Sequence, residues 1–438
     1  MIFYLLLHFQ HKNDMIKSIY KFGGASVKDA EAVRNLADIV SQHKDEDILL
    51  VVSAMGKTTN KLEKLLAEFR AHDGELGMDA LSDVIAYHDG IINDLFGDDT
   101  NPEFAEDIAR LFIELWEKLQ DTTKPFDYQY DQTVCYGELI STTIIQEYLN
   151  KREIPARWLD ARKYVITDDN FRAANPDWDE TRLRITKLND EHIRGLVCLT
   201  QGFIGGTEDG KHSTTLGREG SDFTAAIFAN CLDAEEVTIW KDVDGLLNAD
   251  PKRFKETVMI PHIPYSEAIE LAFYGATIIH PKTIKPLQNK GIRLKVQSFL
   301  HPDHEPTLID GTQNKNDERI PSYIVKDNQT LVSITPRDFS FMNVHNLQVI
   351  FRVCDELNLH ANMIQTSALM LSFCFDSDTV KLEHLKAALG DSFRIRYNEG
   401  LQLFTIRHYR EDSGKDYLEG KRILVQQESR STIQYVLS

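Results

Sequence analysis

Short apolar runs alternate with helical patterns from about residue 16 to residue 300. After a first strand at 16–20, apolar side chains recur at helical spacing, at Val33, Leu36, Ala37 and Val40. Continuous apolar runs, which suit parallel strands covered on both faces, follow at residues 48–52, 196–200 and 237–240. This alternation predicts a three-layer αβα sandwich around a mainly parallel central sheet.

Helix boundaries towards residue 300 are marked by capping residues. Ser266 is predicted to cap a helix that ends at Gly275, and Pro281 to open another that ends at Gly291. Residues 292–296 then have the pattern of a strand. The sequence therefore predicts one α/β domain over residues 15–300.

Pro, His, Asp, Asn and Gly dominate the next segment, which predicts a linker at 301–320. Beyond it, residues 331–389 have the order β-α-β-β-α, which is typical of a small α+β sandwich with helices on one face. No long helix fits between Arg407 and Lys421. Residues 321–438 are thus predicted to form a second domain, in which a resemblance to paired ACT regulatory modules implies one full module and a second, reduced one.

Charge and cysteine content narrow the class of protein. The formal charge of −19 over 438 residues argues against nucleic acid or an anionic membrane as a partner. An anionic substrate would need a local group of cations. The five cysteines form no C-x-x-C pair, which predicts reduced, mostly buried thiols in a cytoplasmic protein.

The N-terminal segment 1–14 lacks the basic region and cleavage site of a signal peptide, and its apolar run is too short for a membrane span. Met15 lies just before the first strand. We therefore expect residues 1–14 to be a dispensable extension.

A Gly-Gly pair follows the first strand, in the segment Lys21-Phe22-Gly23-Gly24. Adjacent glycines let backbone N–H groups approach a phosphate, the following helix N-terminus adds a favourable dipole, and Lys21 supplies a cation for phosphoryl transfer. A purely structural strand-turn-helix explains this stretch equally well. A second Gly-rich run, 205–212, nearly matches a P-loop, but His212 stands where a hydroxyl must bind Mg²⁺, so a hairpin turn is predicted there.

Three further motifs carry candidate chemistry. In 214–226, Gly217 and Gly220 flank Arg218, a fork for a carboxylate, while Ser221 is predicted to cap the next helix and Asp222 to lie in its first turn. Asp222 is equally explained by the helix dipole. In 135–141, Glu138 is expected near a helix start, where a charge is ordinarily only favourable. The motif 240–251 follows a buried strand and suits a nucleotide-edge loop, although Asp-Gly and Asp-Pro also form ordinary turns.

Taken together, these motifs resemble those of the aspartokinase family of the amino-acid-kinase fold, with supporting segments at 52–56, 200–205 and 275–281. The resemblance covers about residues 17–300. It implies ATP-dependent phosphorylation of the side-chain carboxylate of L-aspartate, the first step towards lysine, threonine and methionine.

The resemblance also implies roles for individual residues. Lys21, Gly23 and Gly24 would serve the transferred phosphate and the side-chain carboxylate, with Lys21 and Asp222 as the catalytic pair. Arg218 would bind the α-carboxylate of the substrate, and Glu138 and Asp222 its α-ammonium. Ser53, Thr59 and Ser221 would line the substrate side. ATP would be bordered by Lys241, Asp242, Asp250 and Lys252. No protein metal site is implied, and Mg²⁺ would bridge ATP oxygens.

The residues suit that substrate. A molecule with two carboxylates and one ammonium needs two cations and an anion, and Lys21, Arg218 and Glu138 supply them. No general base is needed, because the attacking carboxylate is already ionised at neutral pH. Ala25, Leu247 and Thr277 depart from the family's usual Thr, Tyr and Lys, which predicts weaker or differently built ATP binding.

Residues 311–438 resemble paired ACT regulatory modules, which implies a homodimer through this region. His345 and Asn362 stand where lysine-sensitive relatives need a Gly and an Asp, so weak or absent lysine inhibition is expected. Two alternatives remain: a kinase of the same fold acting on glutamate, acetylglutamate, carbamate or UMP, or a non-catalytic amino-acid sensor.

Overall fold

The computed structural model describes residues 16–43, 46–74, 76–190, 196–276, 279–313 and 320–438. The predictions for residues 1–14 and Thr277 therefore lie outside the described residues. The chain divides into two compact units. The described part of the first comprises 16–246, 261–268 and 279–313, and that of the second 247–260, 269–276 and 320–438.

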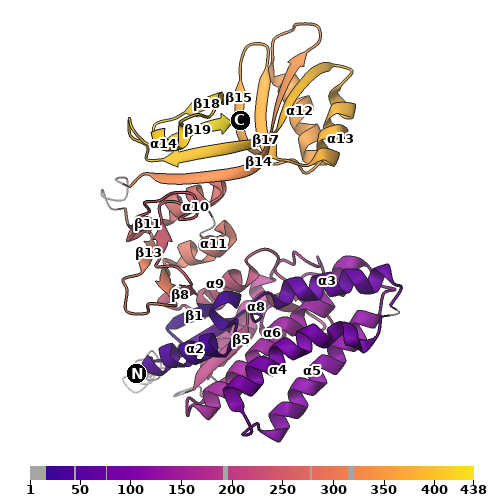
Figure 1. The fold of residues 1–438 in the computed structure, drawn as a ribbon, viewed down its shortest axis with the longest axis vertical. Helices are drawn as coiled ribbons and strands as arrows, with labels where there is room; N and C mark the ends of the chain where they lie inside the picture. The colour runs from indigo at the N-terminus through magenta and orange to yellow at the C-terminus, as the bar shows by residue number, and fades with distance from the viewer. Residues whose placement is uncertain (1–15, 44–45, 75, 191–195, 277–278, 314–319) are drawn as a thin grey trace, which may run out of the picture. The chain divides into compact units, whose positions relative to one another are not determined.

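The first unit is built on a mainly parallel sheet (Figure 1). Within the described residues eight strands form it, in the order β11-β13-β12-β8-β1-β2-β5-β3. Its strands are β1 (Ser18–Phe22), β2 (Ile48–Val52), β3 (Ala156–Leu159), β5 (Val197–Gln201), β8 (Glu236–Lys241), β11 (His262–Pro264), β12 (Arg293–Ser298) and β13 (Thr307–Asp310). β1 pairs in parallel with β2 and β8, while β13 runs antiparallel to β12.

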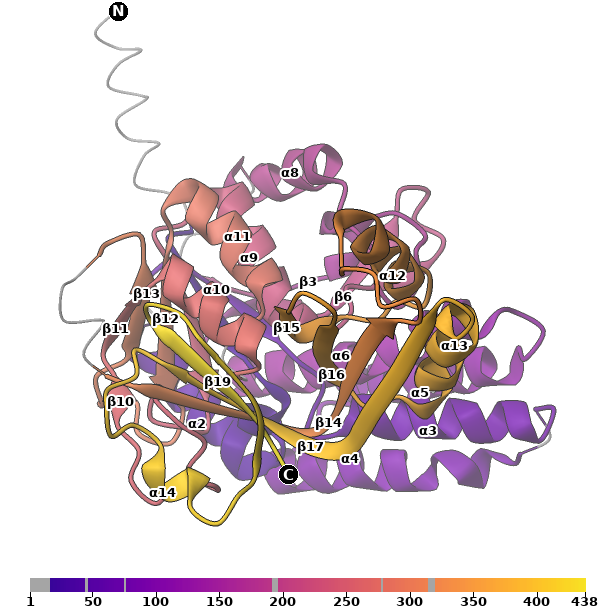
Figure 2. The same ribbon diagram turned by 90° about the horizontal axis from the view of Figure 1, so that it is seen from above.

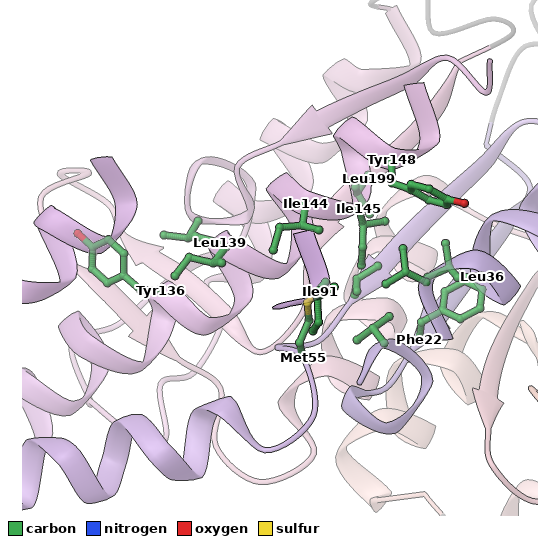
Figure 3. Packing of buried hydrophobic residues seen from close by; sticks show 14 of the residues in the cluster. Phe22, Leu36, Met55, Ile91, Tyr136, Leu139, Ile144, Ile145, Tyr148 and Leu199 are labelled. Carbon is green, nitrogen blue, oxygen red and sulfur yellow. The ribbon is translucent and has the colours of Figure 1, made fainter. Parts of the chain in front are cut away.

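Helices cover both faces of this sheet, as predicted. On one face, α2, α4 and α6 share a continuous apolar core with alternate residues of β1 and β2, including Phe22 and Leu50; part of this core is drawn in Figure 3. On the other face α9 packs against β1, β2 and β8, with α8 and α11 beside it. The helices are α2 (Ala30–Gln42), α3 (Thr58–Ala71), α4 (Ser82–Phe96), α5 (Pro102–Gln120), α6 (Phe126–Lys151), α7 (Ala161–Tyr164), α8 (Trp178–Thr186), α9 (Gly220–Leu232), α10 (Tyr265–Tyr274) and α11 (Pro281–Lys290).

The near-match to a P-loop is a hairpin turn, as predicted. β6 (Ile204–Thr207) and β7 (Ser213–Thr215) pair antiparallel, with Gly205 opposite Thr214, and β4 (Ile166–Thr167) joins β6 in parallel. A Cβ on Gly205 would lie 2.7 Å from the carbonyl oxygen of Val165, so this glycine serves strand packing.

Three predicted boundaries were wrong. Residues 307–310, placed in a linker, form β13, because Thr307 and Ile309 are buried against the sheet. The segment 247–260 lies between parts of the first unit in sequence but belongs to the second. Ser266 lies inside α10, which already begins at Tyr265, whereas α11 begins at Pro281 and ends before Gly291 as expected.

The second unit contains an antiparallel sheet in which six strands of the described chain follow the order β15-β16-β14-β17-β19-β18 (Figure 2). Its elements are β14 (Ser322–Pro336), α12 (Val344–Glu356), β15 (Ala361–Thr366), β16 (Leu371–Asp376), α13 (Thr379–Leu389), β17 (Phe393–Arg407), α14 (Lys415–Leu418), β18 (Ile423–Glu428) and β19 (Thr432–Leu437). α12 and α13 share one apolar core with β14 and β16. Between Arg407 and Lys421 the helix α14 has only four residues, which agrees with the predicted reduction of the second module.

All five cysteines are free and buried, as predicted from their spacing. Burial raises the pKa of Cys135 and Cys374 to about 12 each, so these thiols stay protonated at neutral pH. Among the residues that can be described, no helix is both long and apolar enough to span a membrane.

Candidate functional site

A cavity of about 570 Å³ lies in the first unit, where β1 and β2 end and α9 begins. This is the edge of a parallel sheet at which ligands usually bind. The lining residues are Lys21, Gly24, Ser53, Ala54, Gly56, Thr59, Asn60, Tyr130, Glu138, Arg172, Phe203, Gly217, Arg218, Glu219, Gly220, Ser221, Asp222 and Lys241.

Most residues singled out in the sequence converge on this cavity. Lys21, Gly24, Ser53, Thr59, Glu138, Arg218, Ser221, Asp222 and Lys241 all line it. Asp242 follows Lys241 and is exposed, outside the lining. Asp250 and Lys252 belong to the second unit, so their proximity to ATP stays a prediction.

Lys21 and Asp222 form a buried ion pair, with 2.5 Å between Nζ and Oδ1. The alternation of β1 explains the geometry: Tyr20 and Phe22 point into the core with α2 and α6, so Lys21 faces α9, which carries Asp222. Burial would raise the pKa of Asp222, but Lys21 and Lys241 outweigh it and hold that pKa below its usual value. A charged pair is therefore fixed at the carboxyl end of the central strand.

The two glycines after β1 are required by close packing. A Cβ on Gly24 would lie 2.6 Å from the carbonyl oxygen of Gly56 and 2.9 Å from that of Ala54. A Cβ on Gly23 would meet the Lys21 Nζ at 3.3 Å. The backbone N–H of Gly56 donates to the carbonyl of Gly24, which joins the loops after β1 and β2. Gly24 thus brings the two loops together, and Gly23 leaves space for the lysine ammonium.

The helix dipole at this site comes from α9. The Gly-Gly pair leads directly into the short 3-10 helix η1 (Gly24–Val27), whose four residues supply little dipole, and α2 begins only at Ala30, where Asp29 caps it. The prediction that Ser221 caps α9 was wrong, because the N-cap is Glu219 and Ser221 lies in the first turn. In the described structure no side chain caps α9, and Gly220, Ser221 and Asp222 line the cavity. Its N-terminus can therefore interact with an anion there.

Glu138 projects into the cavity from the middle of α6, whose 26 residues extend from Phe126 to Lys151. The prediction of a position near a helix start was wrong. Gly137 allows the close approach, since a Cβ there would lie 3.1 Å from the Ala54 Cβ. The hydroxyl of Ser141 then donates to the Ser53 carbonyl at 2.8 Å. α6 therefore supports the loop after β2 and presents Glu138 beside it.

The Glu138 carboxylate is buried without a full set of partners. Thr59 donates its hydroxyl to Oε1 at 3.4 Å, while Oε2 finds no hydrogen-bond partner among the residues that the structure describes. Burial raises the pKa of Glu138 to about 8, although hydrogen bonds from backbone N–H groups and Thr59 act in the opposite direction. A buried carboxylate oxygen in a cavity calls for a donor from a ligand.

Sequence analysis missed several residues of the lining, including Asn60, Tyr130, Arg172, Phe203 and Glu219. Tyr130 lies eight residues before Glu138 on α6, so a helical-face argument could have found it. No local signal marks Arg172. The buried Asp131 accepts the backbone N–H of Arg172 at 3.1 Å, and the N–H and hydroxyl of Thr215 at 2.8 and 2.7 Å.

Four basic and three acidic side chains thus face one cavity, in a chain whose formal charge is −19. Cations, an uncapped helix N-terminus and a buried carboxylate with an unpaired oxygen together suit a phosphate beside a small molecule that carries both signs of charge. This combination is what a small-molecule kinase needs at the edge of its sheet.

Comparisons with known proteins support this interpretation of the fold and the site. Residues 17–298 match the model of the amino acid kinase family. The chain is 32% identical over 400 residues to lysine-sensitive aspartokinase 3 of Escherichia coli K12. The aligned region covers 89% of this chain and 86% of that protein. It is 31% identical over 373 residues to the chloroplastic aspartokinase 1 of Arabidopsis thaliana, covering 82% of this chain.

The fold is also similar to a crystal structure of E. coli aspartokinase III in complex with aspartate and ADP, with a TM-score of 0.80, 28% identity and 96% of each chain covered. The chain spans 63% of the length of the Arabidopsis relative and 42% of a bifunctional aspartokinase/homoserine dehydrogenase of Zea mays. It belongs to the aspartokinases of the amino acid kinase family.

Proposed function

We propose that this chain transfers the γ-phosphoryl group of ATP to the side-chain carboxylate of L-aspartate, giving 4-phospho-L-aspartate. The observation that carries the proposal is the buried, unpaired Oε2 of Glu138 in one cavity with the Lys21–Asp222 pair and Arg218. Family membership, and the aspartate named with the similar E. coli enzyme, support it.

In this proposal the acidic and basic side chains of the cavity bind different groups of the substrate. Glu138 accepts the substrate's α-ammonium, and Arg218 binds its α-carboxylate, with Ser53, Thr59 and Ser221 along the substrate side. Lys21, held by Asp222, neutralises charge that develops between the side-chain carboxylate and the transferred phosphoryl group. Because the attacking carboxylate is already ionised, catalysis reduces to alignment and neutralisation.

The nucleotide side also fits the proposal. Lys21, Lys241 and the N-terminus of α9 offer positive charge to phosphate oxygens. The described residues gather no cluster of three or more His, Cys, Asp or Glu side chains suited to a metal. In this proposal Mg²⁺ is held mainly by ATP oxygens, where it adds charge neutralisation.

The proposal extends to assembly and location. β15 is an edge strand of the second unit's sheet, and it carries the exposed apolar side chain of Ile364. An exposed apolar strand edge favours pairing with a second copy, as in a homodimer. Five free thiols suit the cytoplasm.

Trapping the acyl phosphate tests the reaction directly. Hydroxylamine converts an acyl phosphate into a hydroxamate, so the purified chain with Mg-ATP should form aspartyl hydroxamate from L-aspartate. Glutamate, acetylglutamate, carbamate and UMP should give no ADP release above background. Faster turnover of any of these than of aspartate would overturn the assignment, and no turnover of any would favour a non-catalytic sensor.

A further inference from the structure

Glu219 adopts a backbone conformation that suits glycine better than glutamate. Its φ is 54° and its ψ 31°, in the left-handed region, directly before the first residue of α9. Glycines stand nearby in the same loop at Gly217 and Gly220, yet this position carries a Cβ. Strain of this kind tends to lie at functional sites and persists when the surrounding structure holds it.

The Glu219 side chain adds a second unfavourable feature. Glu219 lines the cavity, and its Oε2 is buried with no hydrogen-bond donor in the described part of the protein. A buried carboxylate oxygen without a donor is costly, so such an atom usually meets a ligand. The backbone strain and the unpaired oxygen belong to one residue and face one cavity.

Two of the four basic side chains that line the cavity already have carboxylate partners. Lys21 pairs with Asp222, and Arg172 pairs with Glu63 at 2.9 Å. A phosphate or carboxylate ligand would repel Glu219, whereas an ammonium carries three N–H donors, more than the single unpaired oxygen of Glu138 can accept. The proposed substrate brings one such group.

We infer that Glu219 is a second acceptor for the substrate's α-ammonium, and that with Glu138 it makes the site select an amino dicarboxylate over a dicarboxylate without the amine. This inference rests on the proposed function. It assigns Glu219 to substrate specificity, a role separate from phosphoryl transfer itself.

Paired ligands test the inference in the full chain without ATP. L-aspartate and succinate have the same two carboxylates and differ by the ammonium, and calorimetry gives the affinity of each. Glu219→Gln keeps the size of the side chain and removes its charge. It should weaken aspartate binding by about tenfold to a hundredfold, as expected for a lost hydrogen bond to a charged group, and leave succinate binding within about twofold.

Two further variants separate this role from damage to the fold. Glu219→Gly removes the strained Cβ, so its thermal midpoint should equal or exceed that of the wild type while its aspartate affinity falls like that of Glu219→Gln. Glu208→Gln removes an equal charge from the exposed hairpin turn and should leave both affinities unchanged.

The outcomes distinguish this inference from the function beneath it. Aspartate affinity unchanged in both Glu219 variants, or aspartate and succinate weakened equally, would overturn the role of Glu219 even if the wild type forms aspartyl hydroxamate. A wild-type chain that neither binds aspartate nor forms the hydroxamate would overturn the proposed function itself.

Discussion

At the scale of single residues, the site depends on charges that are buried together. Lys21 and Asp222 are both nearly inaccessible, with side chains 11% and 5% exposed. Removing one member of a buried pair leaves the other uncompensated, which typically costs about 3–5 kcal/mol. The pair is thus required for stability as well as for the proposed chemistry, and a single substitution cannot separate the two roles.

A double substitution can separate them. We expect Lys21→Ala to lower turnover by roughly 10²–10³ and also to lower the unfolding free energy, because Asp222 loses its partner. Lys21→Met combined with Asp222→Asn should regain much of that stability while turnover stays low. Chemical denaturation and hydroxamate formation measure the two effects. Lys17→Ala is the control, since its ion pair with Glu235 is exposed. Turnover regained in the double variant would contradict the role of Lys21.

Aspartate affinity should depend on pH through Glu138. Its pKa of about 8 in the free protein means that the carboxyl is mostly protonated at pH 7, whereas binding an ammonium needs the ionised form. The dissociation constant for aspartate should therefore rise by roughly tenfold for each pH unit below 8. Calorimetry between pH 6 and 8 in buffers of different ionisation enthalpy should also detect release of one proton on binding.

The stability of the ligand-free protein should also depend on pH, because the pKa of Glu138 is raised on folding. The folded pKa lies above the unfolded value of 4.5, so the contribution of Glu138 is complete below pH 4.5 and is lost as pH rises through about 8. Glu138→Gln should bind aspartate weakly and with little pH dependence over this range. A wild-type affinity that is flat between pH 6 and 8 would exclude a protonated Glu138 in the free site.

At the scale of elements, the close approach of the loops after β1 and β2 depends on Gly24, and its contribution to stability can be measured. Gly24→Ala would place a Cβ 2.6 Å from a backbone oxygen that cannot move alone. We expect a loss of several kcal/mol, as for overpacking of a fixed backbone contact, and low turnover in any folded fraction. Gly90→Ala in α4 is the matched control, because a Cβ there meets nothing within 4 Å and should stabilise the helix by about 0.5–1 kcal/mol. Equal melting temperatures for the two variants would show that the close approach is not needed.

Some elements could be predicted from sequence and others could not, for identifiable reasons. The strands at 48–52 and 237–240 are apolar because both faces are covered, and this pattern needs no tertiary information. α6 is different: it is buried on nearly all sides, so it has no polar stripe to mark where it begins, and Glu138 was placed near a start that lies twelve residues earlier. β13 is short and follows residues typical of loops, so only its pairing with β11 and β12 reveals it.

In the candidate site, too, only the residues that a local motif marks could be predicted from the sequence. Motifs of adjacent residues predicted Lys21, Glu138, Arg218 and Asp222, because each motif carries its own local chemistry. Arg172 lies in a loop without a motif and reaches the cavity through the hydrogen bond that its backbone donates to Asp131 on α6. Contacts of this kind depend on tertiary packing, which one sequence does not display.

At the scale of the whole molecule, Asn362 stands where the family resemblance implies an Asp in lysine-sensitive relatives, and it lies in a polar network of the second unit. The Asn362 side chain donates to Gln329 at 2.8 Å and Asp376 at 2.9 Å, and its oxygen accepts from Lys326 at 2.7 Å. Asn362 carries no charge of its own, and the neighbouring Asp376 carboxylate already accepts hydrogen bonds from Asn362 and, at 2.7 Å, from Gln329. A lysine ammonium would have to displace these contacts. His345, at the exposed start of α12, adds bulk where close backbone approach would be needed.

We therefore predict a homodimer whose activity persists at lysine concentrations well above 1 mM. Light scattering during gel filtration gives the mass, and hydroxamate formation against rising lysine and threonine gives the inhibition. Ile364→Asp should shift the mass towards a monomer, because it places a charge on the edge strand β15 at a side chain that is 41% exposed. Val380→Asp on α13, 66% exposed, is the control and should remain dimeric, since that helix follows β16 and leads to the inner strand β17. Strong inhibition by sub-millimolar lysine would mean that Asn362 does not exclude the effector, and a monomer of full activity would contradict the predicted homodimer.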